Sequence, residues 1–283
     1  MYIYQTFFYL SNYIYMTWSF SIETGQVPIA EIHTINGKSL KKTAKKILYL
    51  NNSESDTHEE DLSGVELFRD FTLESNETVV PMYYDADSEK RFPNRIVAAA
   101  GTLQGKSYMV SVLAKSYAKK YPDNNIVLFS WVKNDDNYKS IKKLSKIRID
   151  ETILDDPIEV SELKNSFCIF DDIEHFSNKK IVKELQRLRD SVFNCGRHDN
   201  IAVASARQVL MDGFLTKNIN NSSFITFLFC KGGSRYQAGN WLKTYMHFDK
   251  YMIGKILNLP SRWVMVNKHT PIFILYERGG FII

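Results

Sequence analysis

From residue 93 onward, short apolar runs alternate with segments in which apolar residues recur every three or four positions. Helical spacing covers residues 106–121, where Met109, Leu113 and Tyr117 share one face, and residues 178–196. The runs of strand type cover residues 95–100, 124–131, 167–174, 200–205 and 224–229. This alternation predicts an α/β fold with a mostly parallel sheet and helices on both faces. One or two helices around 235–258 and short strands at 262–267 and 272–277 complete the pattern.

The N-terminal residues follow a different pattern, so we expect two domains, an N-terminal portion at 1–90 and the main domain at 91–283. Two strand-like runs flank Asn36-Gly37, which is a strong hairpin signal. The stretch 51–78 carries nine acidic residues against Arg69 alone, and we expect it to be a surface insertion or a linker.

The first twenty residues are apolar and rich in tyrosine, but they have no basic leading region and no small-residue cleavage site. They therefore do not predict a signal peptide, and they are barely long enough for a transmembrane helix. We expect either an edge strand or a true start at Met16, and no membrane association.

Residues 100–107 read A-G-T-L-Q-G-K-S and lie between a predicted buried strand and a predicted helix. This order is typical of a phosphate-binding loop, whose backbone N–H groups surround phosphates at a helix N-terminus. The usual pattern starts with glycine, but Ala100 adds only a methyl group if its φ is negative, and Gly101 is expected to supply the flexibility. The residues expected to bind the nucleotide are Ala100, Gly101, Thr102, Leu103, Gln104, Gly105, Lys106, Ser107 and Tyr108.

Within this loop, Lys106 is expected to reach the β- and γ-phosphates and to be catalytic, and Ser107 is expected to bind magnesium. A second Gly-Lys-Ser occurs at 37–39. It does not fit a phosphate loop, because Ile32 stands where the first glycine belongs and stiff, β-branched residues follow it.

Two adjacent acids end the apolar strand at 167–174. A phosphate-loop enzyme needs one carboxylate at a strand end to hold hydrated magnesium, and a second one beside it can polarise the attacking water. We therefore expect Asp171 to be a magnesium ligand and Asp172 to be the catalytic base. Glu174 is a rival for the role of base, and a polar helix cap is the structural alternative for the pair.

The next strand, at 200–205, is expected to end near Ser205. A polar side chain at that end would lie beside the γ-phosphate and respond to hydrolysis, so Ser205 and Gln208 are candidate sensors. Lys217 follows in a segment from which a cation can act on a neighbouring subunit's nucleotide. Arg197 and Arg207 are further candidates for that cation.

Charge and cysteine content narrow the function classes. The net charge is +4, but residues 207–268 contain nine basic residues against Asp212 and Asp249. Such a region is suited to contact a polyanion, although a solvated basic face explains it equally well. The three widely spaced cysteines, Cys168, Cys195 and Cys230, indicate reduced thiols in an intracellular protein rather than a disulfide framework or a zinc cluster.

These motifs resemble the genome-packaging ATPases of large double-stranded DNA viruses, the poxvirus-type branch of the FtsK–HerA superfamily. The matching segments are 92–107, 167–174, 196–208, 215–223 and 232–283. The resemblance implies a RecA-like P-loop NTPase core with Walker A and Walker B motifs. It also implies a glutamine sensor, which favours Gln208, and an arginine finger near a Thr-Arg pair, where this chain has Thr216-Lys217.

The resemblance further implies an ATP-driven motor that moves viral DNA into a preformed capsid during virion assembly. ATP and Mg²⁺ are the implied cofactors. The implied partners are double-stranded DNA, bound without sequence preference, other copies of the chain in a ring, and capsid or portal proteins. The implied location is intracellular, in the host cytoplasm, at the viral assembly site or in the virion.

Two alternatives stay open. One is a nucleotide kinase, although the chain has no arginine cluster of the kind that forms a lid over the acceptor. The other is a non-catalytic nucleotide-binding assembly protein, which would account for the departures from the family pattern at Ala100, Asp172 and Lys217.

Overall fold

The computed structural model describes residues 18–35, 45–52, 66–86, 92–132, 135–231 and 235–283. The first seventeen residues, for which we expected an edge strand or a start at Met16, lie outside these ranges. The Asn36-Gly37 turn and the Gly-Lys-Ser at 37–39 also lie outside them. Over the described residues, no helix is long and apolar enough to cross a membrane.

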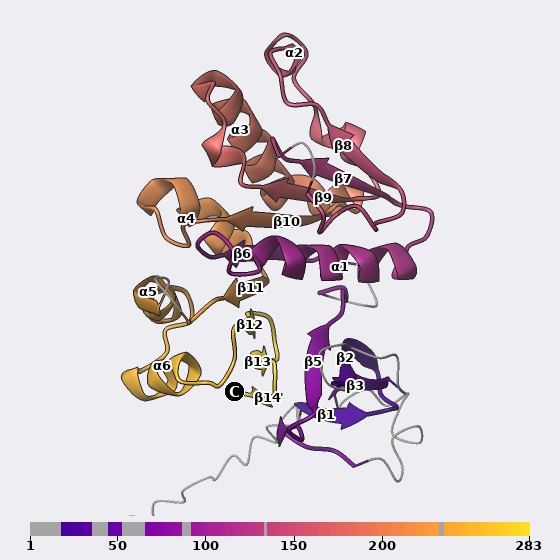
Figure 1. The fold of residues 1–283 in the computed structure, drawn as a ribbon, viewed down its shortest axis with the longest axis vertical. Coiled ribbons are helices and arrows are strands. Elements are labelled where there is room, and N and C mark those ends of the chain that lie inside the picture. The colour runs from indigo at the N-terminus through magenta and orange to yellow at the C-terminus, as the bar shows by residue number, and fades with distance from the viewer. Residues whose placement is uncertain (1–17, 36–44, 53–65, 87–91, 133–134, 232–234) are drawn as a thin grey trace, which may run out of the picture.

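A ten-stranded sheet forms the centre of the molecule (Figure 1), in the order β4-β14-β13-β12-β11-β6-β10-β9-β7-β8. Its parallel strands are β6 (Arg95–Ala99), β7 (Asn125–Phe129), β8 (Leu144–Ile147), β9 (Ser166–Asp171), β10 (Ala202–Arg207) and β11 (Ile225–Leu228). The antiparallel strands that extend it are β12 (Val264–Asn267), β13 (Phe273–Tyr276), β14 (Gly279–Ile282) and β4 (Asp70–Thr72). The predicted α/β core with a mostly parallel sheet is confirmed.

Helices cover both faces of this sheet because successive strand residues point to opposite sides. In β6, Ile96 and Ala98 pack on the side of α1, whereas Val97 and Ala99 pack in the core on the side of α3. The longer helices are α1 (Lys106–Lys120), α3 (Lys179–Cys195), α4 (Gly213–Ser222), α5 (Arg235–Tyr245) and α6 (Lys250–Leu257). The short ones are α2 (Thr152–Asp155), η1 (Val160–Leu163), η2 (Ile173–His175) and η3 (Gly196–Asp199).

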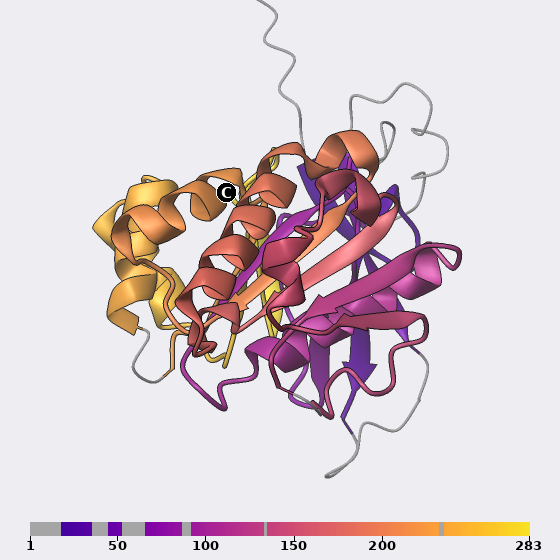
Figure 2. The same ribbon diagram turned by 90° about the horizontal axis from the view of Figure 1, so that it is seen from above.

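An antiparallel sheet of four strands, in the order β1-β3-β2-β5, lies on the α1 side. Seen from above (Figure 2), its indigo strands and the gold helices α5 and α6 lie on opposite sides of the molecule. The strands are β1 (Trp18–Ile22), β2 (Val27–Thr34), β3 (Lys46–Asn52) and β5 (Glu77–Pro81). β2 and β3 pair antiparallel, as a hairpin requires, whereas the predicted turn at Asn36-Gly37 lies outside the described residues.

The acidic stretch is not wholly an insertion or a linker, which corrects the expectation for residues 51–78. Residues 51 and 52 end β3, residues 77 and 78 begin β5, and residues 70–72 form β4. β4 pairs with β14, so a segment from the N-terminal portion adds a strand to the large sheet. The boundary between residues 90 and 91 stays a prediction.

The pairing of β4 with β14 leaves no room for a side chain at Gly279. A Cβ there would lie 2.2 Å from the carbonyl oxygen of Phe71, and the backbone of β4 would have to move. We expect Gly279→Ala to lower the free energy of unfolding by about 1–3 kcal/mol, as for other overpacked sites. Denaturant unfolding measures this change.

Gly254→Ala is the matched control, because Gly254 lies inside α6 and a Cβ there meets no atom within 4 Å. This variant should be more stable by about 0.5–1 kcal/mol, since alanine favours a helix over glycine. An unchanged unfolding midpoint for Gly279→Ala would show that β4 does not pair with β14.

Candidate functional site

The ends of three neighbouring strands bring the predicted motifs together. β10 lies between β6 and β9, and all three run parallel. Arg207 pairs with Ala99, and Ala206 pairs with Asp171, so the three strands end at the same edge of the sheet. The loop at 100–107 and Gln208 follow directly after β6 and β10, and the acid pair spans the end of β9. The predicted motifs therefore meet at one edge of the parallel strands.

The first loop position accommodates alanine. Ala100 is fully buried, its N–H donates to the carbonyl oxygen of Arg207 at 3.0 Å, and its φ is not positive. Gly101, from which we expected the flexibility of the loop, also has a φ outside the left-handed region. Positive φ occurs instead at Leu103 (63°) and Gly105 (100°). Gly105 is therefore the position that favours glycine, and it directly precedes α1.

The N-terminus of α1 points its free N–H groups at this edge of the sheet. No acidic residue lies in the first turn, and Gly105 offers no side-chain cap, so the partial positive charge of this helix end has no counter-charge in its own sequence. Lys106 is the first residue of the helix and is buried. Its Nζ lies 2.8 Å from Oδ2 of Asp172, whereas Thr102 and Leu103 in the loop are exposed.

Asp171 contacts two hydroxyl groups. Ser107 Oγ lies 3.3 Å from its Oδ1, and the Tyr138 hydroxyl donates to its Oδ2 at 2.9 Å. Burial raises the pKa of Asp171 to about 6, the charge of Asp172 adds to this effect, and the hydrogen bond from Tyr138 opposes it. Sequence reasoning missed Tyr138, since it lies in the segment after β7 and no motif there marks it.

Asp172 turns the chain directly after β9. It adopts a left-handed conformation, with φ 50°, and its N–H donates to the carbonyl oxygen of Ala206 at 2.9 Å. One carboxylate oxygen contacts Lys106, and the other, Oδ1, is buried and has no hydrogen-bond partner within the ranges that the structure describes. The two neighbouring acids thus face different groups, one facing the Ser107 hydroxyl and the other the Lys106 ammonium.

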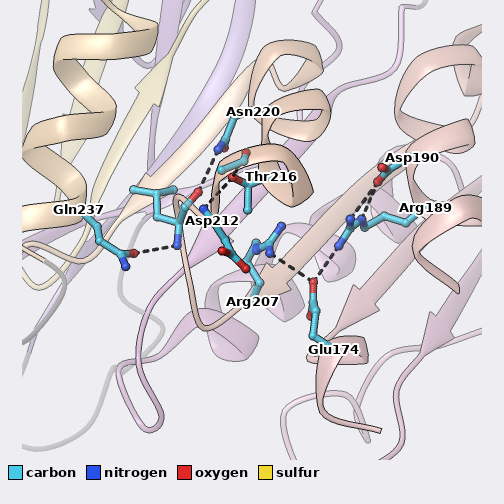
Figure 3. A network of polar contacts seen from close by, with 10 residues as sticks. Glu174, Arg189, Asp190, Arg207, Asp212, Thr216, Asn220 and Gln237 are labelled. Atoms are coloured by element: carbon cyan, nitrogen blue, oxygen red, sulfur yellow. Dashed lines mark hydrogen bonds and ion pairs between the residues drawn. The ribbon is translucent and has the colours of Figure 1, made fainter. Parts of the chain in front are cut away.

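Glu174, the rival for the base, belongs to a buried network of charges (Figure 3). Arg189 Nη1 donates to its Oε1 at 2.7 Å, and Arg207 Nη2 lies 3.5 Å from the same atom. Arg189 also pairs with Asp190, at 2.9 Å. Burial lowers the pKa of Arg207, and its Nε and Nη1 have no hydrogen-bond partner. Two cations therefore already hold the Glu174 carboxylate.

The strand that carries the predicted sensor runs further than expected. β10 extends to Arg207, so Ser205 is a buried residue inside the strand, where its backbone pairs with Phe170 and Val97. Ser205 therefore does not lie at the strand end. Gln208 is half-buried and lies in a loop, as predicted, but it directly follows the strand because β10 ends at Arg207.

The loop after Gln208 is held by side chains of α4 and α5 (Figure 3). Thr216 Oγ1 accepts a hydrogen bond from the backbone of Asp212 at 2.9 Å. The side-chain amides of Asn220 and Gln237 bond the carbonyl oxygen and the N–H of Leu210, each at 2.9 Å. α4 and α5 are thereby fixed to the segment that joins β10 to α4.

The two remaining candidate cations are not part of this cluster. Lys217 lies exposed on α4, and the structure gives it no ion pair or hydrogen bond with any described residue. Its neighbour Thr216 faces the protein interior and is 1% exposed. Arg197 lies in η3, which precedes β10 and therefore lies at the opposite edge of the parallel strands.

The raised pKa of Asp171 predicts a pH dependence of stability. The carboxyl group has a pKa of about 6 when folded, against 3.8 as its ordinary value, so the folded protein holds this proton more tightly. The contribution of this carboxyl group to the free energy of unfolding is therefore fully present below about pH 4, and it is lost as the pH rises to about 6. At about 1.36 kcal/mol per unit, the loss is on the order of 3 kcal/mol.

Denaturant unfolding of the parent and of Asp171→Asn across this pH range measures the effect, which the asparagine variant should lack. Asp123→Asn, at an exposed position after α1, should keep the parent's slope. Equal pH slopes in the parent and Asp171→Asn would contradict a raised pKa.

No protein-family model matches the chain. Among solved structures, the genome packaging NTPase B204 from Sulfolobus turreted icosahedral virus 2 is similar over 65% of this chain and 96% of that chain, with 12% identity and a TM-score of 0.44. The pCW3 conjugation coupling protein TcpA is similar over 88% of this chain and 77% of that chain, with 12% identity and a TM-score of 0.45. Among curated proteins, "Uncharacterized protein V3" of Sputnik virophage is 30% identical over 210 residues, which cover 72% of this chain and 84% of that protein. The chain belongs to the family of this virophage protein.

Proposed function

We propose that this protein binds and hydrolyses ATP, and that hydrolysis drives the translocation of double-stranded viral DNA into a capsid. The observation that carries the ATPase part is the contact of Lys106 with Asp172 at the N-terminus of α1, beside the contact of Ser107 with Asp171. A lysine, a hydroxyl group and two carboxylates at one strand end and one helix start are the groups that phosphoryl transfer from a nucleoside triphosphate uses.

Phosphate binding follows from the start of α1. The backbone N–H groups of the loop and of the first helical turn attract an anion, and the Lys106 ammonium adds a full positive charge. Asp172 and a γ-phosphate compete for this ammonium, since both are anions that it can contact. Binding of a triphosphate therefore releases the Asp172 carboxylate from Lys106.

The residues beside Lys106 fit a magnesium ion. Ser107 Oγ and Asp171 Oδ1 lie 3.3 Å apart, and hydroxyl and carboxylate oxygens are the ligands that Mg²⁺ prefers. Tyr138 holds the other oxygen of Asp171 and so orients the carboxylate. Ser107 and Asp171 would hold the ion, which would supply positive charge to offset that of the phosphate groups.

Asp172 is the proposed general base. Its Oδ1 is buried and has no hydrogen-bond partner, so it is available to accept a proton from the attacking water. The bond from its backbone N–H to Ala206 keeps the carboxylate at the end of β9. Glu174 is less suited to this role because Arg189 and Arg207 hold the same carboxylate oxygen.

Gln208 is the proposed sensor of the γ-phosphate. Along β10, Ala204 and Ala206 belong to the core on the side of α1, whereas Val203 belongs to the core on the side of α3. Extended by one residue beyond the end of β10, the period of two favours the side of α1 for position 208, which is also the side of Asp171 at the end of β9. This placement supports a role for Gln208 beside the phosphate loop.

The motor part of the proposal rests on the resemblance of the motif order to packaging ATPases and on the charge of the C-terminal third. Most of the basic residues between 207 and 268 are exposed, as a surface that contacts DNA phosphates requires. The exposed ones are Lys217, Lys231, Arg235, Lys243, Lys250, Lys255 and Arg262. We assign Lys217 the role of a cation that acts on the nucleotide of a neighbouring subunit.

Asp172→Asn tests the site directly. The variant should bind ATP at least as tightly as the parent, because it removes a negative charge that competes for Lys106. Its turnover should fall by about 10²–10⁴-fold, as expected for loss of a general base. Equilibrium binding of ATP and the rate of phosphate release measure the two effects.

Asp123→Asn, in the exposed segment after α1, is the matched control and should behave as the parent. Lys106→Ala should lose both binding and hydrolysis, whereas Lys119→Ala, exposed near the end of the same helix, should keep both. Full turnover in Asp172→Asn together with loss in Glu174→Gln would move the base to Glu174.

Mixing of variants tests the assembly and the motor. If Lys217 acts between subunits, Lys217→Ala and Lys106→Ala are each inactive alone, and their mixture recovers part of the parent's activity at shared interfaces. An arginine in this role contributes about 10³–10⁵ in rate, and we expect the lower end or less for lysine. Double-stranded DNA should raise the ATPase rate by an amount that does not depend on the DNA sequence and that falls steeply as the salt concentration rises.

Lys183→Ala, exposed on α3, is the control and should leave the rate unchanged. Normal hydrolysis by Lys217→Ala alone would place the cation elsewhere. A rate that depends on neither protein concentration nor DNA would overturn the motor proposal.

A further inference from the structure

Basic and aromatic side chains gather at the edge of the sheet opposite the phosphate loop. Arg95 is the first residue of β6, and Phe224 directly precedes the parallel strand β11. Because β12 runs antiparallel to β11, Lys268 and His269 follow its last residue at the same edge, where Lys268 N donates to the carbonyl oxygen of Phe224 at 2.8 Å. Arg197 lies in η3, just ahead of β10. The starts of the parallel strands thus collect positive charge.

Arg95 is the buried centre of this cluster and is 6% exposed. Its guanidinium carbon lies 4.8 Å from the ring centroid of Phe224 and 5.6 Å from that of Phe92. Nη1 lies 3.4 Å from the carbonyl oxygen of Ser222, and Nη2 is buried without a hydrogen-bond partner among the described residues. A buried guanidinium N–H without an acceptor is unfavourable unless a ligand supplies one.

Two further groups stand beside Arg95. The guanidinium carbon of the exposed Arg197 lies 5.9 Å from the ring centroid of Phe92, so both arginines contact the same aromatic ring. The His269 ring lies 3.8 Å, centroid to centroid, from Phe224, and its Nε2 is buried with no hydrogen-bond partner in the described part of the chain. The cluster therefore has unused donors on two elements that are far apart in the sequence.

The positive charge of the cluster is not compensated within the described part of the chain. No carboxylate there forms an ion pair with Arg95, Arg197 or His269. Burial and the nearby Arg197 lower the pKa of Arg95, and the Cys195 thiol acts in the opposite direction. Burial, Arg95 and Lys268 lower the pKa of His269. A bound anion would favour the protonated forms of Arg95 and His269 and would therefore raise both pKa values.

We propose that Arg95, Arg197 and His269 form a second anion site, separate from the phosphate loop, that binds a phosphate group. Guanidinium groups present planar pairs of N–H donors that match the oxygens of phosphate. Two arginines carry more positive charge than a single carboxylate neutralises, which favours phosphate over a carboxylate ligand. The site does not depend on the proposed ATPase function, because it uses none of the same residues and lies at the other edge of the sheet.

Inorganic phosphate is the first probe, and the NMR titration of His269 is the readout. The experiment uses the full chain with Lys106→Ala, which removes the lysine of the other phosphate site, and the His269 signal is assigned by its loss in His269→Gln. Phosphate should raise the pKa of His269, because a bound anion offsets the charge of Arg95. Adding Arg197→Gln should weaken phosphate binding by about tenfold.

Arg148→Gln is the matched control, since it removes the same charge from a fully exposed arginine on another element and should leave the binding unchanged. Arg197 is exposed, so its replacement is not expected to unfold the protein. The proposal would be overturned if phosphate leaves the pKa of His269 unchanged in the Lys106→Ala protein. It would also be overturned if phosphate binds equally well after the further change Arg197→Gln or Arg148→Gln.

Short duplex DNA is the second probe and identifies the source of the phosphate. The salt dependence of DNA binding is the slope of the logarithm of the binding constant against the logarithm of the salt concentration. If the site holds a DNA backbone phosphate, this slope should be about 0.9 smaller in magnitude for Arg197→Gln than for Arg148→Gln. If inorganic phosphate shifts His269 while the two variants bind DNA alike, the site is one for free phosphate. Phosphate binding and DNA binding are both measured without ATP hydrolysis, so the Lys106→Ala background does not prevent either measurement. Failure of this site is therefore distinguished from failure of the ATPase proposal.

Discussion

Two backbone hydrogen bonds to the end of β10 hold the candidate site together. Ala100 N donates to Arg207 O at 3.0 Å, and Asp172 N donates to Ala206 O at 2.9 Å. They extend the pairing of β6 and β9 with β10 by one residue on each side, at the point where the phosphate loop and the acid pair begin. Buried backbone groups must be paired, so the loop and the acids cannot move apart without breaking these bonds. The contact of Lys106 with Asp172 depends on this constraint.

The acidic residues at and after the end of β9 have different partners on the two faces of the sheet. On the side of α1, Asp171 and Asp172 face Ser107, Tyr138 and Lys106, and one oxygen of Asp172 has no partner. On the side of α3, Glu174 lies between two buried arginines. Removing one member of a buried ion pair leaves an uncompensated charge and is strongly destabilising. Glu174 therefore anchors the segment after β9 to α3, whereas the acid pair contacts groups on the side of α1.

Positive charge occurs at both edges of the parallel strands, for different reasons. At the edge of the phosphate loop, the dipole of α1 and Lys106 attract anions, and Asp172 contacts the lysine. At the opposite edge, Arg95 and His269 are held against aromatic rings, with donors that no described group accepts. An arginine at the start of a buried strand is costly to desolvate, so its burial without a carboxylate is the feature that distinguishes this edge.

The sequence by itself determined the α/β core and the positions of the loop at 100–107 and of the acid pair beside its strands, because these depend on the local order of apolar runs, glycines and charged residues. It made alanine at position 100 conditional on a negative φ, and it did not predict that Leu103 and Gly105 adopt the positive φ values. Only the tertiary structure decided that Tyr138 bonds Asp171, that Glu174 is held by Arg189, and that β4 joins β14. Each of these contacts joins segments whose relative position is set by packing and strand register, and no periodicity or motif in a single chain encodes which distant residues will meet.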